Sequence, residues 1–165
     1  MTAAASRVAI IVGSRSDLDA MARATETLSG LGIDSETRVL SAHRSPALLE
    51  EYVADAEGRG VEVFVCAAGL AAHLPGVVAS RTLRPVIGVP MPGGVGDGLD
   101  ALLSVVQMPR GVPVATVGVG NAVNAGLLAA AILAVGDEGV RERLGRYRAE
   151  QTRAIAEDPQ NREAG

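Results

Sequence analysis

The segment VAIIVGSRSD, residues 8–17, decides the fold. It begins with five consecutive apolar residues, and such a run is typical of a strand that is buried on both faces, as in parallel sheets. The run ends at Gly13, and a helical repeat of apolar residues then continues to a stop at Gly32. The segment therefore predicts a strand, a tight loop and a crossover helix, the unit from which parallel sheets are built.

Comparable β-branched runs follow at residues 36–40, 61–67, 85–89 and 114–119. Helical patterns lie between them; one is expected to start with Ser45 as N-cap and Pro46 as first helical residue, and to end at Gly60. This alternation predicts an α/β fold: a three-layer, doubly wound parallel sheet of the flavodoxin-like type, with strand order 2-1-3-4-5. A long C-terminal helix is expected at about 137–157.

The composition favours one domain. With 165 residues and 48% hydrophobic content, a single domain is expected to span residues 1–165, with its core at about 7–134. The net charge is −4 and aromatic residues make up 2%, so no nucleic-acid partner is expected and any phosphate must be held locally. All fifteen basic residues are arginine, which excludes a Schiff-base lysine and the lysine of a P-loop.

Other residue types exclude further classes of site. The single cysteine, Cys66, lies in the apolar run VEVFVCA and is interpreted as a buried small hydrophobe, not a nucleophile. Two histidines, one cysteine and scattered carboxylates show no metal-ligand spacing, so no metal is expected. The residues MTAAASR lack the apolar core of a signal peptide, and no apolar run reaches the ~20 residues that cross a bilayer. We expect no membrane partner and a cytoplasmic location.

Three loops carry most of the polar chemistry. GSRSD (13–17), SAHRSP (41–46) and AGLAAHLPG (68–76) follow the first three predicted strands. In a parallel α/β sheet, ligands bind beyond the carboxyl ends of the strands, where the strand order reverses. The strand order predicted above makes these three strands neighbours, so the loops are expected to meet at one rim. They would bring together four serines, one aspartate, two arginines and both histidines.

The first loop has the features of a phosphate site: a glycine, hydroxyl groups and backbone N–H groups at a helix start. Capping of that helix by Ser14 or Ser16 is an equally good interpretation. Asp17 would repel phosphate, so it suits ribose hydroxyls better, although a first-turn aspartate favoured by the helix dipole is nearly as good an explanation. Arg44 fits a phosphate ligand at least as well as an ordinary surface charge.

The two histidines differ in how strongly they point to function. His43 stands beside Arg44 in a loop of phosphate and sugar ligands, and an imidazole can both give and take a proton near neutral pH. We therefore predict His43 as the proton carrier. For His73, capping or packing of the next helix competes evenly with a contact to substrate.

In order along residues 7–134, the motifs GSRSD, SAHRSP, AGLAAHLPG, PVIGVP and LDALLSVVQMPRGVPVAT, followed by NAGLLAAAIL, resemble the PurE family of purine biosynthesis. SAHRSP is similar to the N5-carboxyaminoimidazole ribonucleotide mutase branch, whose motif usually has threonine at the position of Ser45. The resemblance implies transfer of a carboxylate from the exocyclic nitrogen of the nucleotide to its ring carbon, without metal or other cofactor. It also implies a homo-octamer that binds a small-molecule nucleotide.

The same resemblance assigns site residues. It implies His43 as the catalytic residue, with Ser14, Asp17 and Arg44 around the ribose phosphate and Ser41, Ala68, Gly69, His73 and Leu74 around the base and carboxylate. The stretch MPGGVGDGLD (91–100) departs from the family by being richer in glycine, which leaves its contacts open.

Three other functions remain as alternatives. Within the family, the enzyme could carboxylate aminoimidazole ribonucleotide directly with carbon dioxide. A flavin-binding electron carrier shares the fold, but it needs aromatic side chains around the flavin, and only Phe64, Tyr52 and Tyr147 exist, all in predicted core or helices. A non-catalytic sugar-phosphate sensor is the third.

Overall fold

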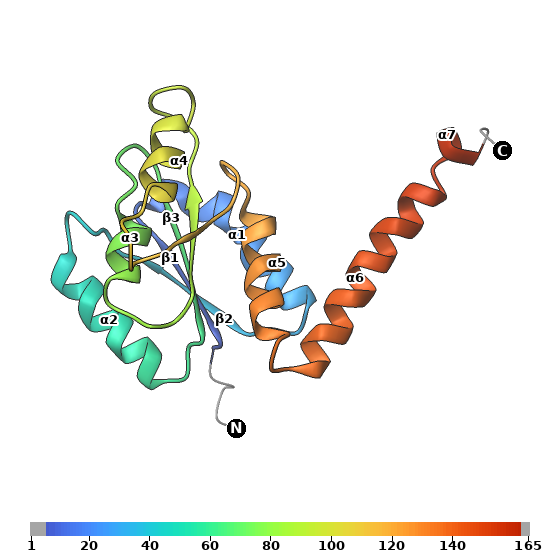
Figure 1. The fold of residues 1–165 in the computed structure, drawn as a ribbon, viewed down its shortest axis with the longest axis horizontal. Coiled ribbons are helices and arrows are strands. Elements are labelled where there is room, and N and C mark those ends of the chain that lie inside the picture. The colour runs from blue at the N-terminus through green and yellow to red at the C-terminus, as the bar shows by residue number, and fades with distance from the viewer. Residues whose placement is uncertain (1–5, 163–165) are drawn as a thin grey trace.

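The computed structural model describes residues 6–162. Strands and helices alternate through most of the chain (Figure 1). The elements in order are β1 (Val8–Val12), the 3-10 helix η1 (Arg15–Asp17), α1 (Leu18–Gly30), β2 (Ser35–Val39), α2 (Pro46–Gly58), β3 (Val63–Ala68), α3 (Leu74–Ala79), β4 (Val86–Pro90), α4 (Leu99–Val106), β5 (Ala115–Thr116), α5 (Ala122–Leu133), α6 (Glu138–Ala156) and α7 (Pro159–Arg162).

The five strands form one parallel sheet in the order β2-β1-β3-β4-β5. The first strand is central: Val12 is paired with Val39 of β2 on one side and with Ala67 of β3 on the other. Carboxyl ends of the three strands therefore lie level at one edge of the sheet. The predicted flavodoxin-like fold and strand order are confirmed.

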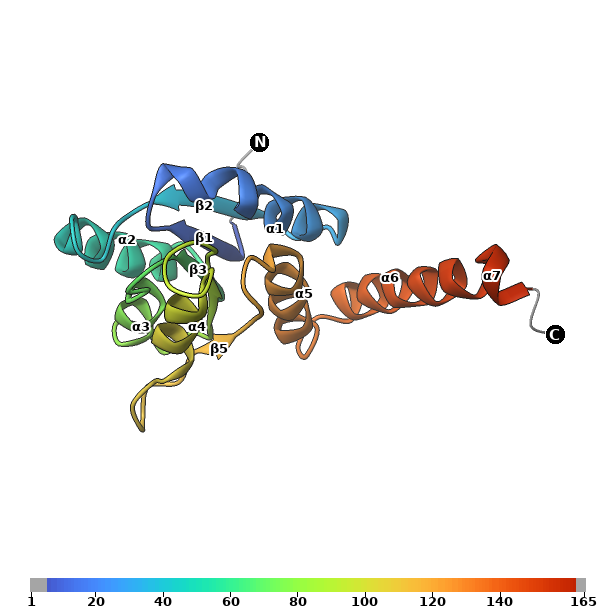
Figure 2. The same cartoon turned by 90° about the horizontal axis from the view of Figure 1, so that it is seen from above.

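The direction of chain travel explains which helix covers which face. The chain steps from β1 to β2 in one direction and then from β2 through β3 and β4 to β5 in the other. Because such crossovers are right-handed, α1 lies on one face and α2, α3 and α4 lie on the opposite face. After β5 the chain returns to the first face, where α5 packs beside α1 (Figures 1 and 2).

Each face of the sheet has its own core. Along β1, Val8, Ile10 and Val12 join the core beneath α1 and α5, whereas Ala9 and Ile11 join the core beneath α2, α3 and α4. All five residues of the strand are buried. This alternation is the period of two that a strand imposes on its side chains, and it explains why the run VAIIV is apolar throughout.

The fifth strand is shorter than predicted. We expected a strand at 114–119, but only Ala115 and Thr116 pair with β4, opposite Ile87 and Gly88. The strand lies at the edge and has one neighbour, so a ladder on one side alone supports it. Beyond it, the chain turns back toward β4 through Gly120, whose φ is +66° and whose N–H donates to the Pro90 carbonyl.

A polar cluster fixes α2 to the edge strand β2. The Tyr52 hydroxyl donates to Glu36 Oε1 at 2.7 Å, and the Arg59 guanidinium donates to both oxygens of the same carboxylate. The bonds from Arg59 hold the pKa of Glu36 below its usual range. These contacts set the position of α2 and thereby of the loop that precedes it, which carries His43.

The first half of the C-terminal helix α6 packs on the core beneath α5. Val140 and Leu144 are buried in the core beneath α5, and the Asp137 side chain accepts from the Val140 N–H and from Arg7. Helical spacing places Ile155 on the same side of α6 as Val140 and Leu144, but Ile155 is 67% exposed. Figure 2 shows α6 projecting away from the sheet, so its second half contacts little of its own chain.

Gly88, in the middle of β4, provides a test of this packing. A Cβ at this position would collide with Val105 of α4 and lie 3.0 Å from a methyl carbon of Val114. We expect Gly88→Ala to lower the free energy of unfolding by about 1–3 kcal/mol, the usual effect of overpacking a core. Thermal unfolding at a fixed protein concentration measures the change.

Gly58→Ala is the matched control, because Gly58 ends α2 and a Cβ there would meet nothing within 4 Å. This change should be neutral or raise stability by up to about 1 kcal/mol. Equal stability of Gly88→Ala and wild type would show that α4 does not pack on β4 as described.

Candidate functional site

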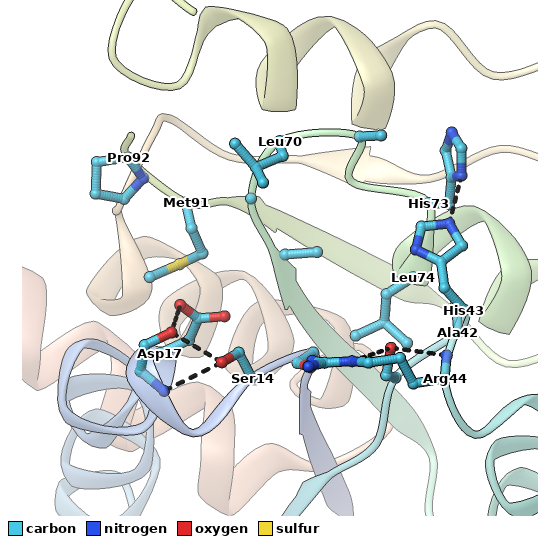
Figure 3. A pocket seen from close by; sticks show the side chains of 16 residues that line it. Ser14, Asp17, Ala42, His43, Arg44, Leu70, His73, Leu74, Met91 and Pro92 are labelled. Carbon is cyan, nitrogen blue, oxygen red and sulfur yellow. Dashed lines mark hydrogen bonds between the residues drawn. The ribbon is translucent and has the colours of Figure 1, made fainter. Parts of the chain in front are cut away.

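A cavity of about 560 Å³ opens at the carboxyl edge of the sheet (Figure 3). Loops that follow β1, β2, β3 and β4 form its walls. The lining residues are Gly13, Ser14, Ser16, Asp17, Ser41, Ala42, His43, Arg44, Ala68, Gly69, Leu70, Ala71, His73, Leu74, Met91 and Pro92. The convergence of three loops predicted from the sequence is therefore present, and a fourth loop joins them.

All nine residues singled out from the sequence line this cavity: Ser14, Asp17, Ser41, His43, Arg44, Ala68, Gly69, His73 and Leu74. The sequence did not predict every lining residue: Met91 and Pro92, which directly follow β4, also line the cavity. Since β4 is the next strand beside β3, the predicted strand order already contained the signal for a fourth loop. The rest of the glycine-rich stretch, beyond Pro92, is not part of the wall.

The first loop is a short 3-10 helix held by hydroxyl groups. Ser14 is its N-cap, and its oxygen accepts from the Ser16 N–H at 3.4 Å and from the Ser16 hydroxyl at 3.0 Å. Capping was one of the two interpretations of this residue; Ser14 caps the 3-10 helix and also lines the cavity. The Ser16 hydroxyl is also 3.2 Å from Asp17 Oδ1.

Asp17 lies at the start of α1 without making a side-chain cap hydrogen bond. Partial burial raises the pKa of its carboxyl group, and the hydrogen bond from Ser16 only partly offsets this. Among the described residues no arginine forms an ion pair with it. Burial thus disfavours the charge of this carboxylate. Because no cation within residues 6–162 is paired with it, its oxygens are available as acceptors for a ligand.

The second loop is organised by two serine hydroxyls. Ser45 is the N-cap residue of α2 and Pro46 is its first residue, as predicted, but the Ser45 side chain makes no cap hydrogen bond. Its oxygen instead accepts from the Ser41 N–H at 3.0 Å and donates to the Ser41 carbonyl at 3.1 Å. The hydroxyl closes the loop on itself and so fixes the backbone between residues 41 and 45.

Arg44 joins the second loop to the first. Its Nη2 donates to the Gly13 carbonyl at 2.8 Å, and its Nε and backbone N–H approach the Ser41 hydroxyl at 3.4 and 3.2 Å. Among the described residues Arg44 has no carboxylate partner. Its position is therefore determined by neutral acceptors, and its positive charge remains available to an anion.

A second hollow of about 420 Å³ adjoins the cavity. It is lined by Gly13, Ser14, Arg15, Val39, Ser41, Arg44 and Ser45. Two guanidinium groups and three hydroxyls thus surround it, and none of these described lining residues is acidic. This donor set suits a phosphate group.

The two histidines are in direct contact. His43 Nε2 lies 2.7 Å from His73 Nδ1, and the rings are close to perpendicular at 78°. In such a contact one of these two nitrogens donates a hydrogen and the other accepts it. His73 occupies the N-cap position of α3 without capping it. Figure 3 shows the pair on one wall of the cavity, with His43 nearer Arg44.

The remaining wall is apolar. Leu70, Leu74, Met91 and Pro92 contribute side chains to it, together with the alanines of the third loop. Figure 3 places Leu70 and Pro92 across the cavity from Arg44 and Ser14. The cavity therefore has a polar side with one cation and several hydroxyls, and an apolar side of small and aliphatic groups.

The other candidate groups lie away from this cavity. Cys66 is fully buried in β3, and burial raises the pKa of its thiol, as expected for a structural residue. Phe64 is buried, and neither Tyr52 nor Tyr147 lines the cavity, so no aromatic pair could enclose a flavin there. Between residues 6 and 162, no three His, Cys, Asp or Glu side chains cluster as metal ligands. Within the same residues, no helix has the length and hydropathy needed to cross a membrane.

The raised pKa of Asp17 predicts a stability effect. Because the folded chain holds the proton more tightly than the unfolded chain, stability falls as the pH rises through the window between the two pKa values. Asp17→Asn removes this penalty and should be slightly more stable than wild type near neutral pH, by less than about 1 kcal/mol after solvent screening. The difference should vanish in acid, below the ordinary carboxyl pKa.

Thermal unfolding of both proteins at about pH 7 and about pH 3 tests this expectation. Asp19→Asn is the control, because Asp19 also lies in the first turn of α1 but is exposed. A variant Asp17→Asn that is less stable than wild type at neutral pH would show that the charge of Asp17 is stabilised in the fold.

Comparisons with known proteins show which family this chain resembles along nearly its whole length. The family model described as AIR carboxylase matches residues 7–154. The N5-carboxyaminoimidazole ribonucleotide mutase of Pseudomonas aeruginosa is 48% identical over 159 residues, which cover 95% of this chain and 98% of that protein. The mutase of Thermotoga maritima is 50% identical, with 95% and 92% covered. A crystal structure of Treponema denticola PurE matches with a TM-score of 0.86 and 27% identity, covering 93% of this chain and 96% of the other. The chain belongs to the AIR carboxylase family, the PurE family that its loop motifs resemble.

Proposed function

We propose that this protein is an N5-carboxyaminoimidazole ribonucleotide mutase of purine biosynthesis. It moves a carboxylate from the exocyclic nitrogen to the ring carbon and gives 4-carboxy-5-aminoimidazole ribonucleotide. The observation that carries the proposal is the His43 ring, which lies in a cavity that is polar on one side and apolar on the other. Relatives that bear the mutase name match nearly the full length of the chain, which favours isomerisation over direct carboxylation.

The shape and charge of the cavity suggest how the nucleotide binds. The phosphate would lie in the second hollow, between Arg44 and Arg15. Asp17 would accept hydrogen bonds from the ribose hydroxyls, since its carboxylate has no cationic partner among the described residues. The base and the carboxylate would then lie against Ser41, Ala68, Gly69, His73 and Leu74.

His43 would act first as an acid and then as a base. Its proton passes to the exocyclic nitrogen, the carbon–nitrogen bond breaks, and carbon dioxide and aminoimidazole ribonucleotide are formed. The electron-rich ring carbon attacks the carbon dioxide to make the new carbon–carbon bond. His43, now neutral, removes the proton from that carbon. His43 takes back as many protons as it gives. None of these steps uses ATP, a metal or another cofactor.

His73 would support this cycle. Because its Nδ1 lies 2.7 Å from His43 Nε2, it can orient the His43 ring and share a proton with it. His73 itself need not touch the reacting atoms.

Product analysis tests the proposed function. The protein is incubated with synthetic N5-carboxyaminoimidazole ribonucleotide or, separately, with aminoimidazole ribonucleotide and bicarbonate. We expect the ring-carboxylated isomer to form faster from the first substrate, and activity to be unaffected by a chelator. Faster formation from the second substrate would favour the carboxylase alternative, and no turnover with either would favour a sensor.

Replacement of the histidines tests the assignment of the proton carrier. His43→Asn keeps a similar size but cannot titrate, so turnover should fall roughly 10²- to 10⁴-fold while the nucleotide still binds. His73→Asn should retain more activity, because an amide can still hydrogen-bond to His43. Steady-state rates and binding isotherms separate the two effects. If His73→Asn were inactive and His43→Asn nearly normal, the proton carrier would be His73.

We further propose that the protein works in the cytoplasm as a homo-octamer. Several large apolar side chains are exposed, including Leu83 and Val135, which are 102% and 80% exposed, and the second half of α6 contacts little of its own chain. Interfaces between subunits would cover these side chains and the projecting helix.

Light scattering tests the assembly. Ile155→Glu places a charge on the projecting half of α6 and should lower the measured mass, whereas Gln151→Glu adds the same charge at an exposed polar position and should leave the mass unchanged. A stable wild-type monomer at micromolar concentration would contradict the proposal.

A further inference from the structure

Leu70 has an unfavourable backbone conformation. Its φ is +56°, and between residues 6 and 162 only one other non-glycine residue, Asp97, has a positive φ. L-residues with large side chains rarely adopt this region, and glycine would fit it without strain. A bulky residue that persists there at the edge of a cavity indicates a functional requirement.

Burial in the core does not explain this residue, because Leu70 is 63% exposed. Its side chain instead lines the cavity and reaches the loop after β4. The space that a Cβ of Gly94 would occupy lies only 2.8 Å from Leu70 Cδ2. A larger residue at position 94 would collide with the Asp100 carboxylate and with Leu70, so the Leu70 side chain closely approaches the loop after β4.

Leu70 is the largest residue in the first part of its loop, residues 68–72. Its neighbours in residues 68–72 are three alanines and one glycine. Figure 3 shows the Leu70 side chain on the cavity wall that faces Arg44 and Ser14. Without it, the part of the apolar wall that residues 68–72 form, beside Leu74, Met91 and Pro92, would consist of backbone and methyl groups alone.

We propose that Leu70 is the residue that retains carbon dioxide in the cavity between the two halves of the reaction. The inference rests on the proposed function. Breaking the carbon–nitrogen bond, with His43 supplying the proton to nitrogen, leaves a small, uncharged molecule that nothing holds covalently until the ring carbon attacks it. An isobutyl group covering the apolar side keeps this molecule next to the ring carbon and keeps water out.

A label experiment tests the inference. The carbamate carbon of the substrate is labelled with carbon-13, the enzyme is in excess, and the buffer contains unlabelled bicarbonate. The fraction of label in the ring-carboxylated product is measured by mass spectrometry, with a sample lacking enzyme as the blank. We expect Leu70→Ala to lose several-fold more label than wild type, and Leu70→Met, which keeps an apolar side chain of similar volume, to retain it.

Two further variants separate retention from folding and assembly. Leu70→Gly suits the positive φ, so it carries the test if Leu70→Ala fails to fold. Leu83→Ala removes an exposed leucine outside the cavity and should retain the label as wild type does.

The outcomes distinguish this inference from the proposed function. If the wild type is active and Leu70→Ala and Leu70→Gly retain as much label as it does, the role of Leu70 is overturned. The proposed function is not affected by that outcome. Loss of label from Leu70→Met or Leu83→Ala to the same extent as from Leu70→Ala would also overturn the role of Leu70. A wild type that forms no ring-carboxylated product would overturn the proposed function and this inference together.

Discussion

The pairing of β1 with two parallel neighbours is the constraint on which the rest of the structure depends. Because Val12 is opposite both Val39 and Ala67, three strands end at the same level. The loops that follow them must then share one edge of the sheet. A chain with few aromatic residues and no lysine can thus assemble a polar site from short loops, since the sheet beneath them supplies the rigidity.

At this edge, three residues have local features that lower the stability of the fold. Asp17 is held where burial raises its pKa, Arg44 has no carboxylate partner among the described residues, and Leu70 has a positive φ. Each feature leaves a group available to a ligand: an acceptor, a cation and an apolar cover. This pattern is expected where activity and stability are in conflict. The two apolar cores on either side of the sheet compensate for it.

Much of the fold could be predicted from the sequence, because apolar runs and helical repeats are local signals. The nine candidate site residues followed from the strand order and the family motifs. Other features could not be predicted, because they depend on contacts between distant loops: the hydrogen bond of His43 with His73, the wall formed by Met91, and the positive φ of Leu70. The two-residue length of β5 likewise depends on its position at the edge, where it pairs with one neighbour only.

The most direct test of the central claim, that the nucleotide binds in this cavity, uses the two histidines of the chain, both of which line it. Nuclear magnetic resonance of the selectively labelled imidazole rings is recorded while 4-carboxy-5-aminoimidazole ribonucleotide is added. We expect both ring signals to shift and to saturate at the same nucleotide concentration. If calorimetry shows that the nucleotide binds but both ring signals stay unchanged, the claim is contradicted and the site lies elsewhere.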